Sequence, residues 1–164
     1  MADDALLGLA SRLGELFKSE QRILALAESC TGGLCSNLVT DIAGSSAWFD
    51  SGYITYSNQA KIEILGVSDI TLKSYGAVSE QTAIEMALGC LRNGRVNIAA
   101  SITGIAGPTG GTPDKPVGTV CFAWVGLGLP TVSKTEHFNG NRQKIREQSA
   151  STALQGLISL LQKK

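Results

Sequence analysis

The sequence predicts an α/β protein, with one domain (1–164) folded as a layered α/β/α sandwich around a mixed, partly antiparallel sheet of about five strands. Three observations lead to this prediction. The 164 residues are a typical length for one domain. The first half alternates short apolar runs with helical patterns, as expected of parallel strands joined by crossover helices. The second half has three consecutive strand patterns whose connecting loops are too short for crossovers, which favours antiparallel pairing.

The elements of the first half follow from apolar spacing. Apolar residues recur at helical intervals from Ala5 to Phe17, which predicts the first helix. The unbroken apolar run 23–27 is typical of a strand buried on both faces. We then expect a helix over 34–42 closed by Gly44, a strand over 52–56, and a short helix over 60–65 stopped by Gly66.

The second half opens with a helix for which Ser79 is a suitable N-cap and which Gly94 is expected to end. The last helix is predicted over 142–162, because its apolar stripe has the clearest period in the chain. Between these helices the sequence predicts three strands, over 96–102, 117–125 and 132–138.

Charge and hydropathy exclude several classes of protein. Fourteen basic and fourteen acidic residues cancel, so no basic footprint indicates nucleic-acid binding. No apolar run reaches the length of a membrane span, and Asp3 and Asp4 stand where a signal peptide has basic residues. We therefore expect a soluble cytoplasmic protein that contacts neither nucleic acid nor membrane.

The four cysteines contain no CxxC pair, and His137 is the only histidine. These spacings do not suit a zinc site, so no metal is expected. Each cysteine lies within an apolar run, which indicates buried free thiols in a reducing compartment.

The segment 27–33, Ala-Glu-Ser-Cys-Thr-Gly-Gly, lies where a buried strand ends and a helix begins. Ligands of open α/β sheets bind at such strand ends, and the free N–H groups of a helix start suit an anion or an oxyanion. Ser29 is the candidate nucleophile, and the amides after Thr31 are the candidate oxyanion donors. The alternative is structural: Ser29 or Thr31 caps the helix, and Gly32 and Gly33 form a turn.

A serine nucleophile needs a base. His137 lies in an alternating strand pattern, where a lone histidine is more often structural than catalytic. Lys61 follows the strand 52–56 and can serve if burial lowers its pKa, although a solvated helix lysine is the simpler interpretation.

Two further segments resemble ligand loops. Ser101-Ile102-Thr103-Gly104-Ile105-Ala106-Gly107-Pro108 follows another strand and has small residues that bring backbone amides close to a ligand, or it is a turn. Arg142, with Arg146 one turn later, opens the last helix, where a cation does not favour the helix dipole. An anionic partner such as a phosphate explains this placement.

Taken together, these segments resemble the CinA C-terminal domain family, whose stand-alone members are nicotinamide-nucleotide amidases. The resemblance covers nearly the whole chain and is carried by residues 27–33, 56–58 with Lys61, 75–80, 103–108, 115–120 and 140–146. The sequence departs from the family at Asn141, where aspartate is frequent, which weakens any claim that a neighbouring carboxylate holds Arg142. It also has no counterpart of the N-terminal pyrophosphatase domain of longer members, so activities of that domain are not expected.

The resemblance implies hydrolysis of nicotinamide mononucleotide to nicotinic acid mononucleotide and ammonia, with no metal and no cofactor. It implies Ser29 as nucleophile and Lys61 as general base. The implied substrate-binding positions are Thr31, Gly32, Gly33, Tyr56, Asn58, Thr103, Gly104, Ala106, Gly107 and Arg142.

Two other functions remain open on the sequence. One is a non-catalytic nucleotide-binding module linked to competence or DNA damage, which has no need of both Ser29 and Lys61. The other is a phosphate-transfer enzyme, which the absence of a Walker motif disfavours. The apolar residues Trp48 and Phe49 favour a homo-oligomer if they lie on the surface.

Overall fold

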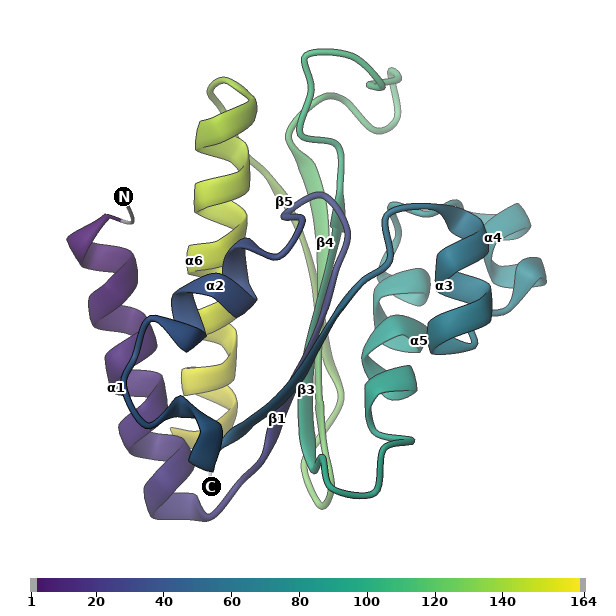
Figure 1. Cartoon of the computed structure of the whole chain (residues 1–164). Helices are drawn as coiled ribbons and strands as arrows, with labels where there is room; N and C mark the ends of the chain where they lie inside the picture. Colours follow the sequence, from purple (N-terminus) through teal and green to yellow (C-terminus); the bar gives the residue numbers. More distant parts are fainter. Residues whose placement is uncertain (1–2, 163–164) are drawn as a thin grey trace.

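The computed structural model describes residues 3–162, which contain a five-stranded sheet with helices on both faces (Figure 1). β1 is parallel to β2 and β3, whereas β4 is antiparallel to β3 and β5. The predicted mixed sheet is thereby confirmed. The strands lie in the order β2-β1-β3-β4-β5, with bounds β1 Leu24–Glu28, β2 Phe49–Ile54, β3 Ile98–Gly104, β4 Thr119–Gly126 and β5 Val132–His137.

The helices form two outer layers, which confirms the predicted sandwich. One face of the sheet carries α1 (Asp4–Glu20), α2 (Leu34–Thr40) and α6 (Arg142–Gln162) (Figure 1). The opposite face carries α3 (Asn58–Leu65), α4 (Asp69–Tyr75) and α5 (Glu80–Cys90) (Figure 1). None of the helices within 3–162 is long and apolar enough to cross a membrane.

Each face of the sheet has its own hydrophobic core. In β1, Leu24 and Leu26 pack into the cluster shared with α1 and α6, while Ala25 and Ala27 pack into the cluster shared with α5. Successive strand residues point to opposite faces, so an unbroken apolar run serves both cores. The alternation continues past the end of β1 and decides which side of the sheet each residue of the next segment faces.

Several element ends are as predicted. The Ser79 hydroxyl accepts a hydrogen bond from the Thr82 amide and caps α5. Gly66 ends α3 in the left-handed conformation, at φ 68°. The helix α6 has the predicted bounds.

Other elements differ from the prediction. The helix α4 was not predicted, because its seven residues bury only Leu72 and have little apolar periodicity; the Ser68 hydroxyl caps it. The helix α5 ends at Cys90 rather than near Gly94, since the following turn closes through Asn93. The helix α2 ends at Thr40, and Gly44 instead precedes the 3-10 turn η1 (Ser45–Ala47).

The cysteines are buried and free, as predicted, and burial raises the pKa of Cys90 to about 12.

The expectation of a surface Trp48 is wrong. Its side chain is 1% exposed and packs against Phe17, with ring centroids 5.6 Å apart. Phe49 is half-buried and packs on the same core, so this pair does not form an apolar surface patch.

Candidate active site

Ser29 follows the last residue of β1, at the edge of the sheet where β3 also ends. Its amide donates to the Ile102 carbonyl at 3.0 Å, which continues the β1–β3 pairing by one residue. The side chain is 8% exposed and points to the α3 face of the sheet. Ser29 therefore occupies the strand end that the sequence predicts for a nucleophile.

Lys61 is brought to Ser29 by the path of the chain after β2. The Thr55 amide donates to the Glu28 carbonyl, which holds the end of β2 beside the end of β1. The Ser57 hydroxyl then caps α3, which begins at Asn58. One helical turn later, Lys61 Nζ lies 3.1 Å from Ser29 Oγ and 2.8 Å from the Thr55 carbonyl oxygen. The predicted pair is adjacent in space although 32 residues separate it in sequence.

The surroundings of Lys61 favour the neutral amine. The side chain is 2% exposed, and burial lowers its pKa below the ordinary value of 10.5, an effect that Cys30 only partly opposes. None of the ion pairs found among residues 3–162 involves Lys61. Burial without a carboxylate partner favours the neutral form of a lysine, which is the form that accepts a proton.

Glu28 is a buried carboxylate to which the sequence analysis assigned no role. One oxygen accepts hydrogen bonds from Thr31 Oγ1 at 2.7 Å and the Cys35 amide at 3.0 Å. The other accepts from Ser36 Oγ at 2.7 Å and the Ser36 amide at 3.0 Å. Glu28 thus accepts from the second and third amides of α2 and links residues 29–33, called the serine turn below, to that helix. The only sequence signal at this position is an acidic residue directly after the apolar run 23–27, and that signal does not indicate what Glu28 binds.

These bonds correct the predicted oxyanion donors. The amides of Cys35 and Ser36 are occupied by Glu28, and the Leu34 amide donates to the Thr31 carbonyl. The first turn of α2 therefore has no free N–H for a ligand. The Thr31 hydroxyl is buried and donates to Glu28, so the predicted substrate contact of Thr31 is left to its backbone.

A cavity of about 240 Å³ lies beside the serine turn. Five predicted substrate-binding residues line it: Tyr56, Gly104, Ala106, Gly107 and Arg142. Four residues with no predicted role complete the lining: Cys30, Ile105, Thr109 and Gly110. All of these come from four segments that the sequence singled out, or lie close to them: 27–33, 56–58, 101–108 and 140–146. Ser29 precedes the lining residue Cys30 in the chain, and neither Ser29 nor Lys61 is itself a lining residue.

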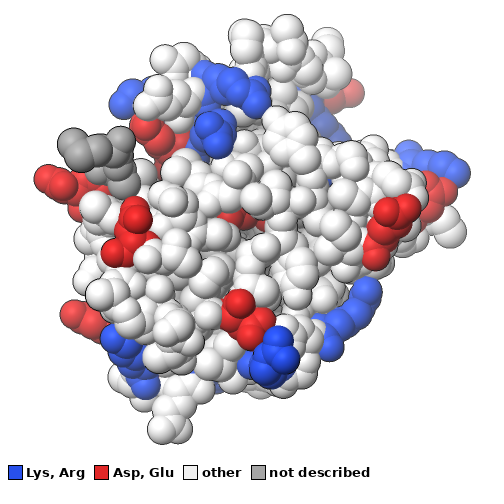
Figure 2. Space-filling model, in the orientation of Figure 1, with Lys and Arg blue, Asp and Glu red and all other residues white. Residues whose placement is uncertain are grey.

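Arg142 connects two of these segments over the cavity. Its Nη1 donates to the Gly107 carbonyl at 2.7 Å, and its Nη2 donates to Tyr56 Oη at 3.0 Å. Figure 2 shows basic side chains gathered at the N-terminal end of α6, beside a largely uncharged surface. The chain as a whole has no net charge, so an anion at this cavity depends on a nearby cation such as Arg142.

The other predicted substrate-binding residues are placed differently. Thr103 is buried within β3, at the same sheet edge as Ser29 but not in a loop, and it donates to the Ala77 carbonyl at 2.8 Å. Asn58 is exposed at the start of α3, outside the cavity lining. Gly32 and Gly33 have φ angles of 57° and 99° and form the turn between β1 and α2.

His137 is too distant to act on Ser29. It lies in β5, three strand spacings from β1, or about 14 Å. Its Nδ1 is 3.3 Å from Thr119 Oγ1. Within residues 3–162, no group of three His, Cys, Asp or Glu side chains is placed to hold a metal ion.

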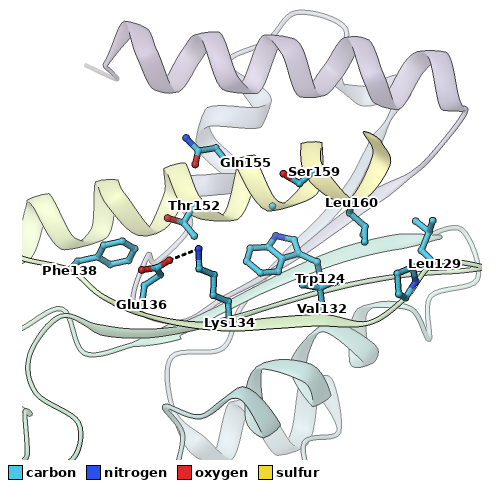
Figure 3. Close-up of a pocket in the computed structure, with 12 residues that line it drawn as sticks. Trp124, Leu129, Val132, Lys134, Glu136, Phe138, Thr152, Gln155, Ser159 and Leu160 are labelled. Carbon is cyan, nitrogen blue, oxygen red and sulfur yellow. Dashed lines mark ion pairs between the residues drawn. The ribbon is translucent and has the colours of Figure 1, made fainter. Parts of the chain in front are cut away.

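A larger hollow of about 500 Å³ lies between β5 and α6 (Figure 3). Its floor is the Trp124 ring, and its one ion pair joins Lys134 and Glu136 of the same strand (Figure 3). Its lining residues show no serine hydrogen-bonded to a base. The smaller cavity beside Ser29 is therefore the better candidate for catalysis.

The chain resembles known proteins over nearly its whole length. Residues 7–161 match the family model described as the CinA C-terminal domain. The chain is 46% identical over 157 residues to nicotinamide-nucleotide amidohydrolase PncC of Escherichia coli (strain K12), covering 96% of this chain and 95% of that protein. The protein of the same name from Enterobacter agglomerans is 49% identical over 155 residues, covering 94% of each. The crystal structure of the competence/damage inducible protein CihA from Agrobacterium tumefaciens has a TM-score of 0.95 at 42% identity, covering 99% of both chains.

Proposed function

Because this chain belongs to the CinA C-terminal domain family, we propose that it is an amidohydrolase that converts nicotinamide mononucleotide to nicotinic acid mononucleotide and ammonia. The observation that carries the proposal is the 3.1 Å contact between the buried Lys61 Nζ and Ser29 Oγ, with no carboxylate paired to Lys61 among residues 3–162. A module that only binds nucleotides has no need of such a pair. The names of the full-length relatives support both the amidohydrolase activity and the nucleotide substrate.

In the proposed mechanism, neutral Lys61 accepts the proton of the Ser29 hydroxyl while Oγ attacks the carboxamide carbon. The Thr55 carbonyl accepts one Lys61 N–H, which leaves the amine lone pair free to face Ser29. The carboxamide oxygen becomes an oxyanion in the tetrahedral intermediate and requires a hydrogen-bond donor.

The intermediate collapses when protonated Lys61 gives its proton to the amide nitrogen. The C–N bond breaks, ammonia leaves, and Ser29 carries the nicotinoyl ester of the nucleotide. A water molecule then gives a proton to Lys61 and adds to the ester carbon. Cleavage of the C–Oγ bond releases the carboxylic acid, which then loses its proton to water, and Lys61 returns its own proton to Ser29.

Ammonia release from nicotinamide mononucleotide, followed with purified protein, tests this proposal. We expect turnover that is unchanged by a metal chelator, since no step uses a metal. Nicotinic acid mononucleotide must form in equal amount. Failure to release ammonia, or loss of turnover on chelation, contradicts the proposal.

Arg142 is proposed to bind the 5′-phosphate. Arg142→Ala is expected to lower kcat/KM for the mononucleotide roughly ten- to a hundredfold, the equivalent of losing one hydrogen bond to a charged group. The loss should fall mainly on KM, because the phosphate is bound equally in the ground and transition states. Steady-state kinetics with nicotinamide mononucleotide and with phosphate-free nicotinamide riboside measure the effect.

The riboside serves as the internal control, since its kinetics should be insensitive to Arg142→Ala. Lys144→Ala, which removes a nearby exposed cation paired with Glu147, should leave both substrates unaffected. An unchanged KM for the mononucleotide, or an equal loss on the riboside, is incompatible with phosphate binding by Arg142.

The lowered pKa of Lys61 predicts the pH dependence of the reaction. The base acts when deprotonated, so kcat/KM should rise with pH through the Lys61 pKa and reach its plateau below 10.5, the ordinary lysine value. Lys61 has its lowered pKa in the folded state and the ordinary pKa of 10.5 in the unfolded state. Between these two values the folded state therefore binds fewer protons than the unfolded state. The free energy of unfolding should therefore increase with pH across the same interval.

Profiles of kcat/KM and of urea unfolding against pH measure both effects. Lys61→Met should remove the rise in unfolding free energy, whereas Lys73→Met, at an exposed lysine of α4, should retain it. An activity profile that still rises at pH 10.5 contradicts a lowered Lys61 pKa.

A further inference from the structure

Arg146 contacts the serine turn from the side of the sheet opposite Lys61. Its Nε donates to the Cys30 carbonyl at 3.1 Å, and its Nη2 donates to the Thr31 carbonyl at 2.9 Å. Arg146 belongs to α6, whereas Lys61 belongs to α3 on the other face (Figure 1). The side chains of Arg146 and Lys61 therefore contact the same short segment from opposite sides.

The peptide geometry determines where the Thr31 amide points. In a trans peptide, the carbonyl and the following N–H point in opposite directions. Because Arg146 draws the Cys30 carbonyl toward α6, the Thr31 N–H is directed toward the α3 face, where the Ser29 side chain meets Lys61. This N–H donates no hydrogen bond to any residue in the range 3–162. It is a free donor next to the nucleophile.

Several nearby amides are already engaged. Glu28 occupies the Cys35 and Ser36 amides, and the Gly32 amide donates to the Ser29 carbonyl at 3.0 Å. Arg146 itself uses two of its N–H groups on backbone oxygens, so the anion-binding role considered from the sequence is not its main contact. Its geometry is that of a bidentate fork acting on the backbone.

We propose that Arg146 is a positioning residue for the amidase reaction, holding the Cys30 and Thr31 carbonyls so that the Thr31 N–H stabilises the oxyanion formed by attack of Ser29. This inference rests on the proposed amidase function. It assigns the oxyanion donor to the turn before α2 rather than to the first turn of that helix. The helix α6 then supplies two residues to the site, Arg142 at the cavity and Arg146 at the serine turn.

Arg146→Lys tests the proposal, because an ammonium group cannot donate to both carbonyls with the geometry of the guanidinium. We expect kcat for nicotinamide mononucleotide to fall roughly ten- to a hundredfold, which is somewhat less than the loss caused by deleting an oxyanion donor. KM should change by less than about threefold. Arg12→Lys, at an exposed arginine of α1, is the matched control and should keep wild-type kinetics. Arg142→Lys should instead raise KM.

Ground-state binding separates positioning from a general structural role. The Kd of nicotinamide mononucleotide, measured calorimetrically in the Ser29→Ala background, should be the same with Arg146 and with Lys at this position. Arg146→Gln supplies a second variant if Arg146→Lys is unfolded at the assay temperature.

The proposal is overturned if kcat stays within threefold of wild type, if Kd weakens as much as kcat falls, or if both variants are unfolded. The wild-type assay distinguishes a failure of the proposed amidase function from a failure of the proposed role of Arg146. A wild-type chain that releases no ammonia contradicts the proposed function and this inference with it. An active wild type with a fully active Arg146→Lys variant contradicts only the role of Arg146.

Discussion

Ser29→Ala and Lys61→Ala are each expected to lower kcat for nicotinamide mononucleotide by roughly four to six orders of magnitude, as found when one member of a nucleophile–base pair is removed. The reason is the direct contact of 3.1 Å between the two side chains, which makes each ineffective without the other. Ammonia release under saturating substrate measures the effect. The double variant should be little worse than either single variant, because the two residues act as one unit.

Lys61→Met refines this test. Methionine approximates the volume of the lysine side chain but cannot accept a proton, so packing is largely kept while turnover is lost. Nucleotide binding should remain measurable in all of these variants. Ser19→Ala and Lys73→Ala, at exposed positions on α1 and α4, provide matched controls with wild-type rates. Near-normal kcat in Lys61→Ala would falsify the Ser-Lys mechanism.

The second large effect is expected on stability. Glu28→Ala leaves two backbone amides and two hydroxyls of the serine turn and α2 without their acceptor. Unsatisfied buried donors cost about 1–3 kcal/mol each, and partial access of water reduces the sum, so we expect the free energy of unfolding to fall by about 3–5 kcal/mol. This corresponds to a Tm lower by roughly 6–20 °C.

Urea unfolding and thermal scans measure this loss. Glu28→Gln should cause an intermediate loss in the free energy of unfolding. Its amide oxygen can still accept two of the four hydrogen bonds, whereas its amide nitrogen cannot accept the other two. Glu15→Ala, at an exposed position of α1, should change the free energy of unfolding by less than about 0.5 kcal/mol. A loss below about 1 kcal/mol in Glu28→Ala would show that water replaces the carboxylate, and that Glu28 does not hold the turn.

Local pattern predicted most of the fold. The α6 bounds, the Ser79 cap and the Gly66 stop follow from short-range physics, namely apolar periodicity, side-chain capping and left-handed glycine. The seven-residue helix α4 was missed for the same reason, since its sequence carries little of that signal and its end caps stabilise it. The surface position expected for Trp48 was wrong because pattern alone does not show that α1 covers it.

The candidate site divides in the same way. Ser29, Lys61 and Arg142 were identified from their segments, and the resemblance to a known family supplied their pairing. No local pattern indicated that Glu28 closes off the amides of α2 or that Arg146 reaches two carbonyls more than a hundred residues away.

The sequence by itself therefore determined the strand-end segments, the helix bounds near strong caps, and the residue types available for chemistry. Only the tertiary structure decided which donors are occupied, which lysine is buried, and which face of the sheet each group of the serine turn addresses. The physical reason is that hydrogen-bond satisfaction and desolvation depend on neighbours distant in sequence, whereas periodicity and capping depend on residues within one or two turns.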